Sequence, residues 1–186
     1  MHRFTILISG GGGLARRVIA ASRETDSTFL VDRVIASRAD CPGLAHSTAA
    51  GIAMAVARPR KVWAAVNDRT DTVLLLGWLH LIDIPQRWAD RVINVHPSLL
   101  PRFGGKGMYG RHVHEAVLRA GERESGFTFH LATDEYDAGP ILHQERVPVL
   151  ADDTVETLQS RVIDAQHHAI IPFLQRWVAT TARAAA

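Results

Sequence analysis

The chain has 186 residues, with 21 Lys and Arg against 19 Asp and Glu, 47% hydrophobic residues and a single cysteine. A compact domain of this length buries enough apolar surface to fold without disulfides, a structural metal or a partner. The near-balanced charge provides no basic stripe for nucleic acid. The longest apolar run is shorter than the roughly 20 residues that a membrane helix needs. We therefore expect neither a nucleic-acid nor a membrane partner.

Cysteine usage and the N-terminal residues suggest a compartment. The lone Cys41 cannot form an internal disulfide, and the first residues lack the basic-then-apolar pattern of a secretory signal. These features predict a cytoplasmic protein. Repeats and long linkers are absent from the sequence, so we predict one domain over 1–180 and a frayed, Ala-rich tail over 181–186.

The first half of the chain alternates between two kinds of pattern. Short apolar, β-favouring runs predict strands at 3–9, 29–37, 52–57, 71–76 and 91–95. Helical spacing follows Gly13 and recurs at about 43–50 and 59–67. This alternation predicts an α/β fold, with a Rossmann-like, doubly wound, mostly parallel sheet and helices on both faces.

The second half has a different organisation. Two strands are predicted at 126–132 and 140–149, with no room for a helix between them, so antiparallel or mixed pairing is expected there. A long helix follows, capped by Asp153 or Thr154, with an apolar stripe that packs against the sheet. Pro172 is expected to bend this helix or divide it.

Four consecutive glycines, Gly10 to Gly13, connect the first strand to the first helix. Such a turn lets backbone N–H groups and the helix dipole approach an anion, most often a phosphate. Gly10, Gly12 and Ala15 also fit a dinucleotide-binding pattern, and Arg38 could meet a 2′-phosphate. The pattern lacks its usual acidic residue, and a turn that only permits close packing explains the glycines equally well.

A polar pair follows the fifth strand, where ligands of open α/β sheets bind. Asn94 and His96 are two residues apart, so an extended chain places both side chains on one face. There an amide N–H and an imidazole can converge on one oxygen and stabilise an oxyanion. The alternative is a capping Asn and a surface His.

The segment around this pair resembles a known family. The residues at 94–101, NVHPSLLP, resemble the NIHPSLLP segment of phosphoribosylglycinamide formyltransferases. The segment LGWLHLI at 76–82 is similar to a loop of that family, and so is TDEYDAGPI at 133–141. The segment GGKGMYG at 104–110 is similar to a loop found in some members. Order and approximate spacing agree over most of the chain.

The resemblance implies a formyltransferase fold and a reaction. An amine would attack the formyl carbon of 10-formyltetrahydrofolate, with Asn94 and His96 holding the tetrahedral oxyanion and Asp137 supporting proton movement. The residue types suit this chemistry, because it needs a neutral amide donor, an imidazole favoured as a cation by a carboxylate, and a proton acceptor. Asp137 alone would otherwise be read as a turn residue.

The same resemblance implies two binding regions, while the residues themselves predict no metal. The folate would be bound, largely through backbone groups, by two loops, whose residues are Gly77, Trp78, Leu79, His80, Leu81, Ile82, Ala132, Thr133 and Asp134. The amine acceptor would be bound by Gly11, Gly12, Gly13, Pro97 and His167. The spacing of His112 and His114 would favour a shared metal only on a strand, whereas a helix is expected there.

The resemblance fails in the acceptor half of the site. The family's turn usually reads G-x-G-S/T-N, whereas Gly12, Gly13 and Leu14 offer only backbone donors. His167 stands where many members carry a Glu. We therefore expect a small primary amine, which can be phosphorylated: glycinamide ribonucleotide or a divergent acceptor. A formyltetrahydrofolate hydrolase and an NADP-dependent reductase using the glycine turn stay open, and the oligomer is expected to be a monomer or homodimer.

Overall fold

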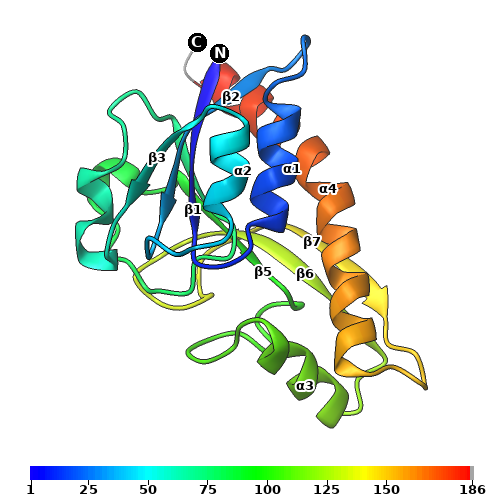
Figure 1. Cartoon of the computed structure of the whole chain (residues 1–186). Helices are drawn as coiled ribbons and strands as arrows, with labels where there is room; N and C mark the ends of the chain where they lie inside the picture. Colours follow the sequence, from blue (N-terminus) through cyan, green and yellow to red (C-terminus); the bar gives the residue numbers. More distant parts are fainter. Residues whose placement is uncertain (185–186) are drawn as a thin grey trace.

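The computed structural model describes residues 1–184, and its strands form one seven-stranded sheet (Figure 1). The strands are β1 (His2–Ile8), β2 (Phe29–Ala36), β3 (Ala53–Val56), β4 (Thr72–Leu75), β5 (Val92–His96), β6 (Glu124–Leu131) and β7 (Ile141–Pro148). Their order is β3-β2-β1-β4-β5-β6-β7. The first five are parallel, while β6 and β7 pair antiparallel. The mostly parallel sheet with mixed pairing in the second half is confirmed.

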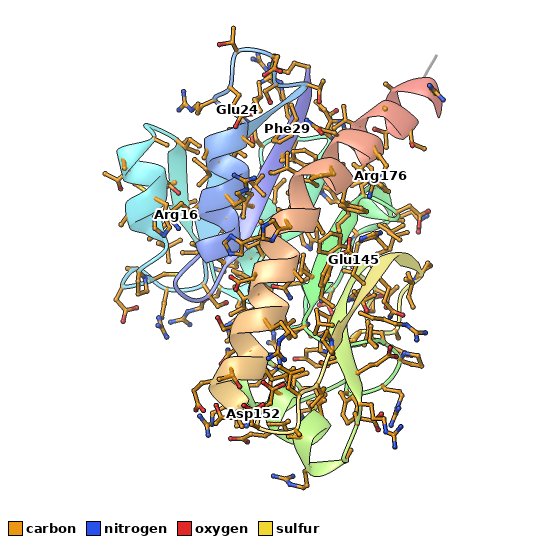
Figure 2. The ribbon with its side chains drawn as sticks, turned by 90° about the vertical axis from the view of Figure 1, so that its right-hand side faces the viewer. Arg16, Glu24, Phe29, Glu145, Asp152 and Arg176 are labelled. Atoms are coloured by element: carbon orange, nitrogen blue, oxygen red, sulfur yellow. The ribbon has the colours of Figure 1, made fainter. Side chains whose placement is uncertain are left out.

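Helices cover the sheet unequally on its two faces. One face carries α1 (Gly13–Ala21), α2 (Leu44–Ala49) and α4 (Val155–Ala184), and Figure 2 shows α1 and α4 side by side. The other face carries two short 3₁₀ helices, η1 (Pro59–Ala64) and η2 (Gln86–Trp88). The alternation along β1 explains both layers, because Phe4 and Ile6 enter one core cluster and Leu7 enters the other.

The helix predicted at 59–67 is wrong in type and length. The segment is a 3₁₀ helix that begins at Pro59 and ends at Ala64. Trp63 explains this geometry, since its indole Nε1 donates to the backbone oxygen of Asp83 at 2.6 Å and its ring stacks on Trp88 at 5.5 Å. Tertiary contacts therefore override the local helical spacing, as they often do for short segments.

The long C-terminal helix α4 begins as predicted. The Oγ1 of Thr154 accepts the backbone N–H of Thr157 at 3.3 Å, which confirms an N-cap. Pro172 lies inside α4 without dividing it, and the ribbon changes direction near the labelled Arg176 (Figure 2). Proline removes one helical hydrogen bond and crowds the preceding turn, which accounts for a bend.

The predicted frayed tail is wrong over 181–184. Helix α4 continues to Ala184, because alanine is the strongest helix former and Thr181 donates through Oγ1 to the backbone oxygen of Trp177 at 3.0 Å. Residues 185 and 186 lie outside the described residues. Within the described chain, none of the helices has the length and apolar character needed to cross a membrane.

Candidate active site at the carboxyl ends of the parallel strands

A cavity of about 580 Å³ opens where the parallel strands end. The glycine turn, the segments after β4 and β5, the loop before helix α3 (Arg111–Arg119), the loop after β6 and one side of α4 all contribute to its wall. Almost every residue predicted for the site lines this cavity: Gly11, Gly12, Gly13, Gly77, Trp78, Leu79, His80, Leu81, Ile82, Asn94, His96, Pro97, Ala132, Thr133, Asp137 and His167.

The carboxylate of Asp137 is the centre of a polar cluster in the cavity wall. Its Oδ2 lies 3.3 Å from Nδ1 of His96 and accepts the backbone N–H of Gly105 at 2.9 Å. Its Oδ1 lies 3.3 Å from Nδ2 of Asn94 and 3.6 Å from Nε2 of His130. Burial would raise the pKa of Asp137, but the hydrogen bond and charge of His96 and the backbone N–H of Gly105 hold it far below its usual range.

Both side chains of the predicted oxyanion pair, Asn94 and His96, contact other protein groups. Asn94 Nδ2 lies within hydrogen-bond distance of both Asp137 and His130, the latter at 3.0 Å. His96 Nε2 lies 2.8 Å from the backbone oxygen of Phe103, and its Nδ1 faces Asp137. Both nitrogens of His96 thus face acceptors. Asn94 and His96 converge on the Asp137 carboxylate.

Sequence reasoning missed His130, which is 1% exposed. Its Nδ1 lies 2.9 Å from the backbone oxygen of Leu131, which can only accept, so Nε2 is left to accept the amide of Asn94. The register of β5 and β6 places His130 directly opposite Asn94. Residues opposite each other in an antiparallel pair share one face, but a sequence does not give the register.

A buried hydrogen-bond network orders the turn after β5. Thr128 Oγ1 donates to the backbone oxygen of Ser98 at 2.7 Å and accepts from the backbone N–H of Leu100 and from Gln144 Nε2, at 3.2 and 2.8 Å. Its side chain is fully buried. The network fixes the turn after β5. Because this turn places the backbone oxygen of Phe103 next to His96, the network stabilises the polar cluster around Asp137 indirectly.

Replacing Thr128 by Val is expected to lower the free energy of unfolding by about 3 kcal/mol, because three buried polar groups lose a partner while the side-chain shape is kept. Urea unfolding followed by circular dichroism measures this change. A loss below about 0.5 kcal/mol, the level of an ordinary surface substitution, would contradict the assigned network.

The two predicted folate loops are joined to each other. The backbone N–H of Leu81 donates to Tyr136 Oη at 3.2 Å, and that of Ile84 donates to Asp134 Oδ1 at 2.9 Å. Asp134 is not part of the cavity wall: its exposed carboxylate joins the two loops, and its contact with folate stays a prediction. Tyr136, which the sequence reasoning passed over, does line the cavity.

The loop after β4 is anchored by its apolar side chains. Trp78 and Ile82 are 6% and 4% exposed and enter the core on the 3₁₀ face, while Leu79 and Leu81 stay exposed. Gly77 adopts a φ of 81°, which favours glycine. With Trp78 and Ile82 anchored in the core, the backbone of this loop lies along the cavity wall, which fits the recognition expected of it.

The carbonyl groups of the glycine turn are held by the segment before and within α2. The backbone oxygen of Gly10 accepts from Cys41 Sγ and from the N–H of Gly43, both at 3.1 Å. The backbone oxygen of Gly11 lies 3.1 Å from His46 Nε2. A turn whose carbonyls are bound elsewhere has its N–H groups available for an anion at the N-terminus of α1.

His167 and the glycine turn lie together, as predicted for an acceptor site. A Cβ on Gly13 would lie 3.7 Å from His167 Nε2. Burial lowers the pKa of His167, and the charges of Arg16 and Arg17 lower it further against the opposing effect of Asp164. Lys106, on the loop before α3, is the one Lys or Arg in the part of the cavity wall that the structure describes.

Among residues 1–184, no three His, Cys, Asp or Glu side chains are grouped so that they could hold a metal ion. The two histidines considered for a metal lie on helix α3 and differ in exposure. His114 is 1% exposed, whereas the side chain of His112 is 59% exposed. Their ring nitrogens therefore do not share one open position.

The fold and this site define an α/β protein of the formyl transferase class. The formyl transferase family model matches residues 2–174. The phosphoribosylglycinamide formyltransferase of Escherichia coli is 33% identical over 94% of this chain and 85% of its own length. The chain therefore belongs to the formyl transferase family, in its phosphoribosylglycinamide formyltransferase group. The reductase alternative has no support in these matches.

Solved structures agree with this placement. The chain superimposes on a phosphoribosylglycinamide formyltransferase from Brucella melitensis with a TM-score of 0.85 and 36% identity, covering 96% of each chain. A glycinamide ribonucleotide transformylase 1 from Symbiobacterium toebii gives a TM-score of 0.83 and 31% identity, over 97% of this chain and 89% of that one. The chain spans 61% of the chloroplastic relative of Arabidopsis thaliana, to which it is 36% identical.

Proposed function

We propose that the protein transfers the formyl group of 10-formyltetrahydrofolate to the primary amine of glycinamide ribonucleotide. One observation carries the proposal: the cluster of Asn94, His96 and Asp137 lies in the wall of a single cavity that the predicted folate loops and the glycine turn also line. The relatives named above are formyltransferases of this acceptor, which favours glycinamide ribonucleotide over a divergent amine.

The residues suit each step of such a transfer. The amine nitrogen forms a bond to the formyl carbon, and the C=O electron pair moves to oxygen, which becomes an oxyanion. The N–H of Asn94 that reaches Asp137 can turn to this oxygen, and the ring of His96, when protonated, stabilises its charge. Asp137, released from Asn94, accepts the proton that the amine loses, and collapse expels the folate nitrogen, which takes up that proton from Asp137.

The acceptor's phosphate is assigned to the glycine turn. The turn lacks the hydroxyl and amide side chains common in the family, but its carbonyl groups are bound by Cys41, Gly43 and His46, so its N–H groups can serve without them. Gly10 and Gly11 have no atom within 4 Å of where a Cβ would lie, which leaves room for a ligand.

The proposal is tested by mixing the protein with 10-formyltetrahydrofolate and following deformylation of the folate with and without glycinamide ribonucleotide. Turnover that requires glycinamide ribonucleotide is the expected result. Turnover that is equally fast without an amine would replace the proposal by the hydrolase alternative. Turnover with a different amino-sugar or amino-nucleoside only would show that the acceptor is divergent.

The pH dependence of acceptor binding tests the role of His167. Because burial lowers its pKa, the ring is neutral at pH 7, and a bound phosphate would favour its protonated form. Binding then takes up a proton, so the KM for glycinamide ribonucleotide should fall in the wild type relative to His167→Gln as pH falls from about 8 to about 6. Equal pH profiles of KM in the two proteins would remove His167 from the phosphate site.

Compartment and assembly follow from the same reasoning. We expect a cytoplasmic enzyme, since the single cysteine is buried and hydrogen-bonded to a backbone oxygen. We expect a monomer or homodimer, which sedimentation velocity distinguishes.

A further inference from the structure

His114 is a buried histidine that the proposed chemistry leaves unused. It lies on the inward side of α3, lines the active-site cavity, and is 1% exposed. Its Nδ1 is buried and has no hydrogen-bond partner among residues 1–184. Buried polar atoms without a partner are rare in native proteins and call for an explanation.

The position of the orphaned atom indicates which nitrogen of His114 carries the proton. A neutral imidazole has one N–H and one lone pair, and a buried N–H without an acceptor is rarer than a buried acceptor without a donor. The proton therefore belongs on Nε2, the nitrogen that is not enclosed. His114 then presents an N–H donor to the cavity.

The neighbouring donors already have protein partners. Asn94 donates towards Asp137 and His130, and His96 is held between Asp137 and Phe103. An oxyanion formed there would need two donors. If the contacts that fix His96 are kept, rearranging these groups supplies only one donor, the N–H of Asn94. His114, next to His96 and without a partner, is the donor that needs no rearrangement.

We propose that His114 is a catalytic residue whose Nε2–H donates to the oxygen of the formyl group as it becomes an oxyanion. This inference rests on the proposed transferase function, since it assigns His114 to the same reaction. With the N–H of Asn94, which turns to the oxyanion, the donor would complete a pair directed at the developing charge.

A neutral donor is the form that this position can sustain. Burial, together with the charge of His96, lowers the pKa of His114 to about 4, so the ring is neutral at pH 7. A second imidazolium beside His96 would be repelled. A neutral donor also attracts no anion into the site before the reaction, so its contribution grows mainly as negative charge develops.

Three variants separate donation from packing. His114→Met keeps an apolar side chain of similar size without a donor, and it should lower kcat by about 100-fold while the folate Kd and the acceptor KM change little. His114→Gln keeps a neutral N–H and should retain kcat within about 10-fold of wild type. Val117→Ala, on the same buried side of α3, controls for lost packing and should lower Tm without lowering kcat.

Either of two kinetic results would overturn the proposal. One is a kcat of His114→Met within about threefold of wild type. The other is a His114→Gln variant that is as slow as His114→Met, which would show that the donor is irrelevant.

A spectroscopic measurement tests the assigned tautomer of His114 without relying on kinetics. Long-range ¹H–¹⁵N correlation spectra of the ¹⁵N-labelled wild type at pH 7, assigned by comparison with His114→Gln, report which ring nitrogen is protonated. Nε2–H is expected, and Nδ1–H would overturn the proposal. This measurement needs no substrate, so its result does not depend on the proposed function. A wild type that is inactive with glycinamide ribonucleotide would contradict the proposed function, whatever the spectrum shows.

Discussion

Replacing Asp137 by Asn is expected to lower kcat for formyl transfer by about 1,000-fold, within the range of general-base contributions, and to leave folate affinity nearly unchanged. Asn adopts the positive φ of 55° found at this position, so the turn is preserved. The amide cannot take the proton of the amine, and it presents an NH₂ group to the donors of Gly105 and His96. The loss therefore falls on catalysis.

Steady-state kinetics with glycinamide ribonucleotide, together with calorimetric titration of the folate, measure the two expectations separately. Asp152→Asn, which removes an exposed carboxylate at the labelled turn before α4, controls for the change in charge (Figure 2). If Asp137→Asn retained more than about a tenth of the wild-type kcat, Asp137 would not be the proton acceptor.

Replacing Gly139 by Ala should cost at least about 100-fold in kcat/KM, because a shift near 1 Å in a catalytic loop is enough for such a loss. A Cβ at this position would lie 1.8 Å from the backbone oxygen of Leu131, which is rigid main chain at the end of β6. The loop would have to move, and Asp137, two residues earlier, would move with it. Glycine is required here because the backbone oxygen of Leu131 lies too close for any side chain.

The measurement pairs kcat/KM with Tm for Gly139→Ala and for Gly121→Ala. Gly121 has a φ of 66° and open space around its Cβ position, so its substitution adds backbone strain of about 1 kcal/mol far from the site. Gly121→Ala should lose Tm but keep kcat/KM. Equal kcat/KM for the two variants would mean that Gly139 does not position Asp137.

The strands were predictable because their signals are local. The run around Val73 is apolar without alternation, as buried parallel strands are, and β4 is fully buried. The segment around Trp63 shows the limit of such reasoning. Its helical spacing predicts an α-helix, but the contacts that select a 3₁₀ helix involve Asp83 and Trp88, about 20 residues away.

The candidate site was predictable in part. Asn94 and His96 follow from strand alternation, and Asp137 joins them through the resemblance. The place of His130 in the site depends on the register between β5 and β6, and that of His114 depends on how α3 packs against the cavity. Local sequence patterns predict neither. Asp134 lies outside the cavity wall because its carboxylate accepts from Ile84 of the other loop, a contact that loop membership alone does not reveal.

The central claim is that the formyl carbon moves to the amine of glycinamide ribonucleotide. The most direct measurement is a single-turnover reaction of the wild type with 10-formyltetrahydrofolate labelled with ¹³C in the formyl group, followed by mass spectrometry of the products. The account predicts that the label appears on glycinamide ribonucleotide, in equal amount to the tetrahydrofolate released. Label recovered as formate, with or without the acceptor, would contradict it.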